Sequence, residues 1–223
     1  MKGINMKHKQ TYFTIASTIL VIFMMLGYVV KFYPDAVSGI DSAIQTSVRG
    51  ELPKHLTTFF KLMTNFGHEF LVFVYTFVIA AVFYFWKNWK MEAIFLSGNL
   101  LLMGVFSTIF KYLYARPRPL LEYLVKKPMG PSFPSWHSAS SMLVALSLII
   151  IVEQHLSKTF VKRCLQALLL VIAITTAISR IYLGVHYPTD ILGGWLLAVA
   201  IVAAVYPIYD QKRFEWRFQG KQD

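Results

Sequence analysis

Six long apolar stretches constrain the fold of this chain more than any other feature. They cover about residues 11–31, 69–86, 93–112, 138–153, 164–182 and 189–208. A helix that crosses the hydrocarbon core of a bilayer needs about 20 mostly apolar residues, and each stretch reaches or approaches this length. The sequence therefore predicts an all-α polytopic membrane protein, a six-helix transmembrane bundle that forms a single domain over residues 1–223.

The composition agrees with a membrane protein and excludes other classes. Apolar residues make up 56% of the 223 residues and charged residues only 15%, against roughly 25% charged in soluble domains. The aromatic content of 16% excludes a disordered chain. The first stretch is longer than the apolar core of a cleaved signal peptide, so we expect an uncleaved first span. Cys164 is the lone cysteine and lies in an apolar run, which predicts a small buried thiol and no intramolecular disulfide.

The segment between the first two spans, about residues 37–66, has a different pattern. Apolar side chains recur every three or four residues, first at Val37, Ile40, Ile44 and Val48 and again after Pro53. This spacing predicts amphipathic helices. Their moderate hydrophobicity favours helices that lie in the plane of the membrane interface. Ordinary helices that pack on the bundle are the alternative.

The net charge of +11 has an asymmetric distribution. Six spans put both termini on one side of the membrane, and 12 of the 22 Lys and Arg residues lie on that side in short loops and tails. This density predicts a multi-pass protein of the cell membrane whose termini are cytoplasmic. The basic residues on that side are expected to meet anionic lipid headgroups, so the positive charge does not indicate a nucleic-acid-binding surface. The 12 residues are Lys2, Lys7, Lys9, Lys87, Lys90, Lys158, Lys162, Arg163, Lys212, Arg213, Arg217 and Lys221.

Polar residues gather in three clusters at the opposite side of the membrane. A single ionisable residue at a span end is commonly an interfacial anchor, but three clusters that converge on one face indicate a functional site. The clusters are Lys111 with Arg116-Pro-Arg118-Pro119, then Pro131-Ser-Phe-Pro-Ser-Trp-His137, and finally Ser179-Arg180 with His186-Tyr-Pro-Thr-Asp190.

The residue types in these clusters favour phosphate chemistry. Lys111, Arg118 and Arg180 are cations, and arginine matches phosphate oxygens with two parallel hydrogen bonds. Ser135 is a candidate N-cap at the start of the fourth span, where free backbone N–H groups of Trp136 and its neighbours would bind an anion. Together these donors would surround the oxygens of a transferring phosphoryl group.

The two histidines of the clusters differ in their neighbours. Asp190 follows His186 by four residues, with Pro188 between them at a candidate first helical position. The carboxylate could fix the imidazole tautomer and leave Nε2 of His186 free as a nucleophile. His137 lacks a carboxylate at such spacing and suits a general acid. A helix-capping Asp190 beside an interfacial His186 is the alternative.

The remaining histidines are weaker candidates for site residues, and the sequence offers no metal-binding motif. His68 could line the entrance of the site, whereas His55 lies on the polar side of an amphipathic segment and is expected to be solvated. No HExxH motif or acidic pair indicates a catalytic metal.

Three motifs resemble those of the type 2 phosphatidic acid phosphatase family of integral-membrane lipid phosphatases, in particular its phosphatidylglycerophosphatase B-like members. The family's first motif, Lys, six residues and Arg-Pro, matches Lys111 to Arg118-Pro119. Its second, Pro-Ser-Gly-His, corresponds to residues 134–137. Its third, Ser-Arg, five residues, His, three residues and Asp, matches residues 179–190.

The resemblance implies roles for these residues and no metal or other cofactor. Lys111, Arg118 and Arg180 would hold the phosphate, and Ser135 with the helix start after it would complete the site. His186 would form a phosphohistidine, with Asp190 orienting it and His137 protonating the leaving alcohol. Water would then hydrolyse the intermediate.

One residue departs from the family pattern. Trp136 stands where the second motif has glycine. Glycine lets a backbone approach a ligand closely. Tryptophan keeps the backbone N–H, but its side chain must point elsewhere, either as an interface anchor or as a wall that narrows the pocket.

The function that these observations favour is metal-independent dephosphorylation of a membrane lipid phosphate at the outer face. Phosphatidylglycerophosphate and phosphatidic acid are the first candidate substrates, and undecaprenyl diphosphate, in recycling of the cell-wall lipid carrier, is the alternative. A lipid-phosphate binder without catalysis and an anion transporter are more distant alternatives. A transporter would carry polar residues through its spans, whereas these spans are almost entirely apolar at mid-depth. The sequence does not fix the oligomeric state.

Overall fold

The computed structural model describes residues 6–222, and over this range the chain forms helices and connecting loops without a β-strand. Six helices of this range are long and apolar enough to cross a membrane, which confirms the predicted number of spans. The elements in chain order are α1 (Met6–Phe32), α2 (Asp35–Arg49), α3 (Lys54–Met63), η1 (Thr64–Gly67), α4 (Glu69–Ala81), η2 (Val82–Trp86), α5 (Lys90–Tyr114), α6 (Trp136–His155), α7 (Thr159–Tyr182) and α8 (Pro188–Phe218).

Local sequence signals explain where the helices begin and end. α6 begins after Ser135, whose hydroxyl accepts a hydrogen bond from the backbone N–H of Ser138 at 3.5 Å. α8 begins at Pro188, since proline suits the first helical position. α5 ends at Tyr114, and its C-cap Ala115 has a left-handed conformation two residues before Pro117. These three boundaries place the predicted motifs at helix ends.

The second predicted span, 69–86, matches the structure, whereas the other five predicted spans are shorter than the helices. The fourth covers Trp136–His155 instead of 138–153, and the sixth covers Pro188–Phe218 instead of 189–208. Hydropathy falls at the edge of the bilayer, but the backbone hydrogen bonds of a helix continue beyond that edge. In the last turns of α8, Lys212 and Glu215 form an ion pair at 2.7 Å between successive turns.

Much of the apolar surface of the bundle faces outward. Only 22% of the α1 span and 17% of the α4 span are buried inside the protein. Val21, Met25 and Val105 are all more than half exposed, as expected for side chains in contact with lipid. Cys164 is also exposed, so the prediction of a buried thiol is wrong. The apolar run around it faces outward on α7, because in a membrane protein an apolar segment need not lie in the interior.

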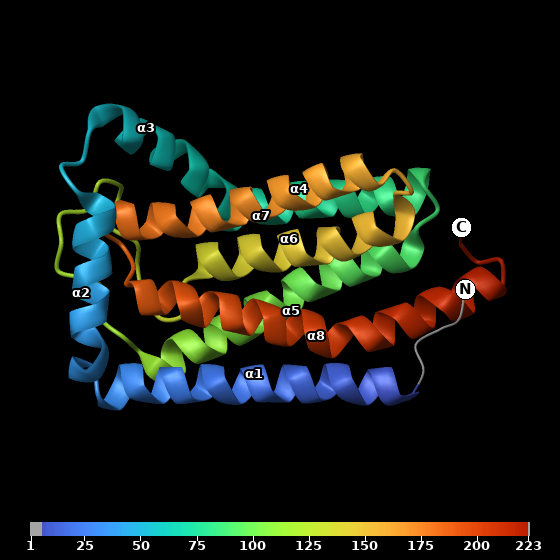
Figure 1. The fold of residues 1–223 in the computed structure, drawn as a ribbon, viewed down its shortest axis with the longest axis horizontal. Coiled ribbons are helices and arrows are strands. Elements are labelled where there is room, and N and C mark those ends of the chain that lie inside the picture. The colour runs from blue at the N-terminus through green and yellow to red at the C-terminus, as the bar shows by residue number, and fades with distance from the viewer. Residues whose placement is uncertain (1–5, 223) are drawn as a thin grey trace.

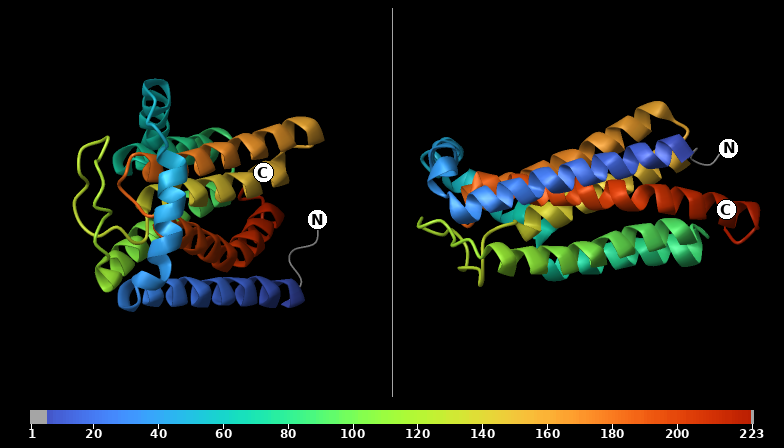
Figure 2. Two further views of the ribbon diagram at one scale, coloured as in Figure 1. Left: turned by 60° about the vertical axis from the view of Figure 1, so that its left-hand side comes forward. Right: turned by 90° about the horizontal axis from the view of Figure 1, so that it is seen from below.

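The helix ends that carry the predicted motifs meet at one end of the bundle. α1 begins and α8 ends at the opposite end, so both ends of the described chain lie together there (Figure 1). At the motif-bearing end, α5 and α7 finish while α6 and α8 start (Figures 1 and 2). α6 lies between its neighbours and contacts α5, α7 and α8. The bundle therefore brings segments from all three motifs to one place.

α2 lies across this end of the bundle, and α3 projects beside it (Figure 1). Both helices were expected in the 37–66 region. On α2 the buried residues are Val37, Asp41 and Gln45, whereas Ile40 and Ile44 are 62% and 40% exposed. The helix thus packs a partly polar face on the bundle and leaves its isoleucines outside. None of the residues of α3 is buried, in keeping with a helix at the membrane interface.

One of the cations assigned to a tail on the terminal side is buried instead. Arg213 is 6% exposed, and its Nε donates to Oε1 of Glu92 at 2.5 Å. The same carboxylate oxygen lies 2.8 Å from Nε2 of His155. Arg213 therefore neutralises a buried carboxylate and does not meet lipid headgroups, which corrects the prediction for this residue. Lys2 lies outside the described residues.

Candidate active site

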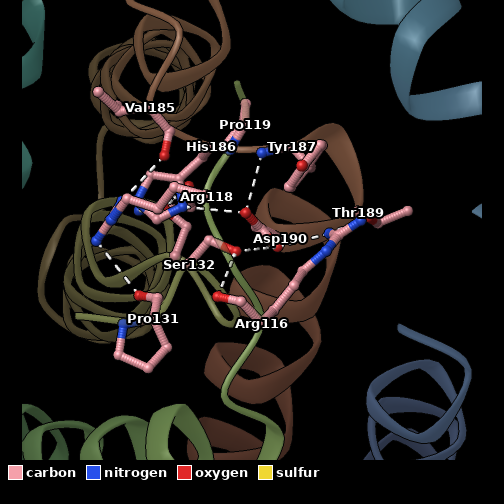
Figure 3. A network of polar contacts seen from close by, with 12 residues as sticks. Arg116, Arg118, Pro119, Pro131, Ser132, Val185, His186, Tyr187, Thr189 and Asp190 are labelled. Atoms are coloured by element: carbon pink, nitrogen blue, oxygen red, sulfur yellow. Dashed lines mark hydrogen bonds and ion pairs between the residues drawn. The ribbon is translucent and has the colours of Figure 1, made fainter. Parts of the chain in front are cut away.

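A buried arginine, Arg116, links two carboxylates from distant parts of the chain. Figure 3 shows its contacts with Thr189 and Asp190 at the start of α8. Arg116 Nη1 donates to Oδ1 of Asp190 at 2.7 Å, and its Nη2 donates to Oδ2 of Asp41 at 2.7 Å. The three side chains are at most 6% exposed. Although burial alone would lower the pKa of Arg116, the two carboxylates raise it above its usual value, so the guanidinium stays charged.

The first turn of α8 strengthens this network. The backbone N–H of Thr189 donates to Oδ1 of Asp41 at 2.9 Å, and the Thr189 hydroxyl donates to Oδ2 at 2.8 Å. Arg116 Nη1 also contacts the Thr189 hydroxyl at 2.7 Å. Asp41 thus caps α8 from α2, and a negative charge there is favourable at a helix N-terminus. The network holds α2, the segment after α5 and the start of α8 together.

One carboxylate oxygen of Asp190 binds Arg116, and the other faces His186. Its Oδ2 lies 3.2 Å from Nδ1 of His186 and accepts the backbone N–H of Tyr187 at 2.9 Å. On its other side, Nε2 of His186 lies 3.2 Å from Nη1 of Arg118. A carboxylate only accepts hydrogen bonds and a guanidinium only donates them. His186 is therefore protonated at Nδ1, and Nε2 carries the free electron pair.

The surroundings of His186 keep its imidazole neutral. The side chain is buried, and burial lowers its pKa well below the usual value. The positive charges of Arg180, Arg118 and Lys111 lower the pKa further. A neutral ring with a free Nε2 is the form of histidine that can act as a nucleophile.

Two predicted cations meet at the loop before α6. Lys111 Nζ donates to the carbonyl oxygen of Pro131 at 2.9 Å. Arg118 donates to the carbonyls of Gly130 at 3.0 Å and Val185 at 2.9 Å. These bonds to neutral oxygens orient both side chains without neutralising them. Their positive charges therefore remain available to an anion.

The third predicted cation, Arg180, is positioned from another element. Its Nη1 donates to the hydroxyl of Thr64 in η1 at 2.6 Å. The Nε atom is buried and has no hydrogen-bond partner among residues 6–222. A buried donor without a partner is costly, and a bound anion would satisfy it.

The residues before α6 lie at the start of the helix, as expected. Ser135 is the N-cap, and its backbone N–H donates to the carbonyl of Asp190 at 3.1 Å, which ties the start of α6 to the first turn of α8. Trp136 is 8% exposed, and its ring stacks on Phe73 of α4 at 5.9 Å between centroids. The indole thus packs between two helices and is not an anchor at the membrane surface.

One cleft collects most of the predicted residues. Its volume is about 950 Å³, and it opens between η1, the starts of α4 and α6, the end of α5 and the loop that follows α5. Of the eight predicted site residues, Ser135 and Asp190 support the cleft from behind, and the other six line it. These are Lys111, Arg118, Trp136, His137, Arg180 and His186. His68 lines the cleft as well, whereas His55 is exposed and does not.

Sequence reasoning missed several supporting residues. The sequence motifs include Arg116 only as a neighbour of Arg118, and they do not include Asp41 or Thr64. Asp41 has one detectable signal, because it is an acidic residue inside an amphipathic helix and its neighbours there are apolar or small. Nothing in the local sequence predicts that Thr64 contacts Arg180.

Comparisons with known proteins agree with this geometry. A family model described as the PAP2 superfamily matches residues 92–214. The chain is similar to phosphatidylglycerophosphatase B of Bacillus subtilis, with 29% identity over 82% of this chain and 89% of the relative. It is also similar to an undecaprenyl-diphosphatase of the same organism, with 24% identity over 60% of this chain and 66% of the relative.

A solved structure supports the fold in the same way. The crystal structure of a transmembrane PAP2-type phosphatidylglycerolphosphate phosphatase from Bacillus subtilis superposes with a TM-score of 0.77 and 26% identity. The superposition covers 88% of this chain and 96% of the chain in the crystal structure. The chain is therefore a multi-pass membrane protein.

The carboxylate on α2 can be tested by Asp41→Asn. The change removes one of the two negative charges that neutralise buried Arg116, and we expect a loss of about 1–3 kcal/mol of stability. Thermal unfolding in detergent micelles measures this loss. Asp35→Asn is the control, because Asp35 lies on the same helix and is exposed. Equal melting temperatures for the two variants would show that the network does not stabilise the fold.

Gly67 can be tested by Gly67→Ala. A Cβ atom at this position would lie 2.8 Å from both Cα and Cβ of His137, so η1 or α6 would have to shift. We expect a fall in turnover of at least about tenfold, because small displacements of reacting groups are costly. Gly98→Ala is the control, since a Cβ there meets nothing within 4 Å. A Gly67→Ala variant as active as Gly98→Ala would contradict this close contact.

Proposed function

Because the chain belongs to the PAP2 superfamily, whose model matches residues 92–214, we propose that the cleft removes phosphate from a membrane lipid through a phosphohistidine at His186. The observation that carries the proposal is the position of His186, whose Nδ1 lies 3.2 Å from the Asp190 carboxylate and whose Nε2 lies 3.2 Å from the Arg118 guanidinium. This arrangement favours a ring whose Nε2 is free of a proton. In this proposal residues 1–223 form one lipid phosphatase domain without a metal or other cofactor.

The first step transfers the phosphoryl group to the enzyme. Lys111, Arg118 and Arg180 bind the phosphate oxygens, and Arg118 exchanges its bond to His186 for one to the substrate. α6 begins at Trp136, directly after its N-cap Ser135. Backbone N–H groups in this first turn donate further hydrogen bonds to the phosphate. Nε2 of His186 then attacks phosphorus as the bond to the lipid oxygen breaks.

Proton transfer completes the two half-reactions. His137 lines the same cleft and donates a proton to the leaving lipid oxygen. It then accepts a proton from a water molecule that attacks phosphorus, which breaks the bond to Nε2 and releases inorganic phosphate. Asp190 holds Nδ1–H throughout and stabilises the positive charge that the ring acquires.

The relatives suggest the class of lipid. Phosphatidylglycerophosphate and phosphatidic acid are the substrates we favour, because the phosphatidylglycerophosphatase B relative matches more of the chain at higher identity. Undecaprenyl diphosphate is the second candidate, because the undecaprenyl-diphosphatase relative is also similar. Both classes carry a phosphate on an apolar tail that would remain in the bilayer.

The proposed orientation places the cleft at the outer face of the cytoplasmic membrane. It rests on the density of Lys and Arg in the short segments at the other end of the bundle. Lys87, Lys158 and Lys162 lie in or beside the loops at that end.

Turnover of purified protein tests the proposed reaction. We expect phosphate release from phosphatidylglycerophosphate, phosphatidic acid or undecaprenyl diphosphate in mixed micelles, with undiminished rate in EDTA. His186→Ala removes the nucleophile and is expected to lower turnover by at least about 1,000-fold. His55→Ala is the matched control, because His55 is exposed and outside the cleft.

Three results would count against the proposal. Loss of turnover in EDTA would contradict the metal-free reaction. Unchanged turnover of His186→Ala would remove the proposed nucleophile. Binding of these lipids without any phosphate release by the wild type would identify a lipid binder instead of an enzyme.

Cysteine labelling tests the orientation. In a Cys164→Ser background, Lys127→Cys places a thiol in the exposed loop near the cleft, and Lys158→Cys places one in the exposed loop between α6 and α7. We expect a membrane-impermeant maleimide to label the first in intact cells and the second only in inverted vesicles. The reverse pattern would place the cleft at the cytoplasmic face.

A further inference from the structure

The cleft contains one carboxylate among its cations. Its lining side chains include Lys61, Lys126 and the three proposed phosphate ligands, five basic side chains in all. Glu69 is the one acidic residue among the described residues that line it. A carboxylate repels a phosphate, so its presence in an anion site calls for a physical explanation.

The local structure explains only part of this placement. Glu69 occupies the first turn of α4, where a negative charge interacts favourably with the helix dipole. The side chain is nevertheless exposed to the cleft, and it forms no hydrogen bond or ion pair with any residue of the range 6–222. It lines the same cleft as Lys111, Arg118 and Arg180. Glu69 is therefore unpaired but close enough to the proposed phosphate ligands to affect what binds there.

Glu69 also lies where the cleft meets the lipid-facing surface. The next residue on α4, Phe70, is 69% exposed and does not line the cleft. On the other side, Tyr112 of α5 lines the cleft and is 73% exposed. A substrate whose phosphate binds beside His186 and whose tail lies in the bilayer must leave the cleft past this boundary. In such a complex Glu69 would face the part of the substrate that connects the reacting phosphate to the tail.

We propose that Glu69 is a specificity-determining residue that favours lipid phosphate monoesters with a hydroxyl beside the scissile bond over lipid diphosphates. This inference rests on the proposed function. In a diphosphate, the group that leaves is a second ionised phosphate, which the Glu69 carboxylate repels. In a glycerol phosphate monoester, the leaving alcohol can carry a neighbouring hydroxyl, and this hydroxyl can donate a hydrogen bond to the Glu69 carboxylate.

The size of the effect follows from the charges involved. Two unit charges several ångströms apart at a protein surface interact strongly enough to change a rate by roughly ten- to a hundredfold. The effect lies at the lower end of this range because solvent and salt screen an exposed carboxylate. We therefore expect a change in selectivity of about tenfold when the charge is removed.

The experiment compares kcat/KM for phosphatidylglycerophosphate and for undecaprenyl diphosphate in the same micelles. The variants are wild type, Glu69→Gln, Glu69→Asp and Glu122→Gln. Glu69→Gln is expected to lower the ratio of kcat/KM for phosphatidylglycerophosphate to kcat/KM for undecaprenyl diphosphate about tenfold. The main cause is faster turnover of the diphosphate. Glu69→Asp keeps the charge and is expected to keep the ratio within about threefold. Glu122 is exposed and outside the cleft, so its variant controls for loss of surface charge.

The outcomes separate this inference from the proposed function. An unchanged ratio in Glu69→Gln, or an equal change on both lipids, would overturn the specificity role and leave the proposed reaction intact. The same shift in Glu69→Asp as in Glu69→Gln would also overturn it, because the charge would then not be the cause. If the wild type hydrolyses phosphatidic acid but neither of these two lipids, this inference fails alone. If it hydrolyses none of the three lipids, the proposed function fails as well.

Inhibition by small anions gives an independent readout that does not depend on the lipid tail. Inorganic phosphate and pyrophosphate compete with substrate for the cations, and pyrophosphate extends further toward Glu69. Glu69→Gln is expected to increase inhibition by pyrophosphate about tenfold relative to inhibition by phosphate. An unaltered ratio of the two inhibition constants would contradict the proposed repulsion.

Discussion

The buried contact between Arg116 and the carboxylates of Asp41 and Asp190 is the interaction on which the rest of this end of the bundle depends. Buried charges are tolerated only when they are paired and hydrogen-bonded, and here each carboxylate oxygen has a partner. The contact joins α2, the segment after α5 and the first turn of α8. It also fixes Asp190 so that its second oxygen faces His186, which sets the tautomer of the proposed nucleophile.

The bundle explains why such a polar site can exist in a chain that is mostly apolar. The helices turn their apolar side chains outward to lipid, so the charged groups collect where α5 and α7 end and α6 and α8 begin. At the ends of membrane-spanning helices, side chains lie near the depth of lipid headgroups. A phosphate attached to a lipid would reach this depth while its tail stays in the bilayer. The position of the cleft thus fits a substrate that never leaves the membrane.

The sequence predicted features that depend on short-range patterns. The lengths of the apolar stretches predicted six spans. The four-residue spacing of His186 and Asp190 predicted that both side chains lie at the start of one helix. Contacts between distant segments could not be predicted in this way. Asp41 reaches Arg116 from α2, and Thr64 reaches Arg180 from η1, because the fold brings these elements together. Cys164 and Arg213 were misplaced for one reason: hydropathy does not tell which face of a helix meets lipid and which meets protein.

The most direct test of the account is to trap the phosphoryl group on the enzyme. The His137→Ala variant with p-nitrophenyl phosphate suits this purpose, because the leaving group needs no acid while hydrolysis of the intermediate lacks its base. The account predicts a burst of about one p-nitrophenol per enzyme and, after alkaline digestion and mass spectrometry, a phosphate on His186. A phosphate on another side chain, or turnover with neither a burst nor modified His186, would contradict it.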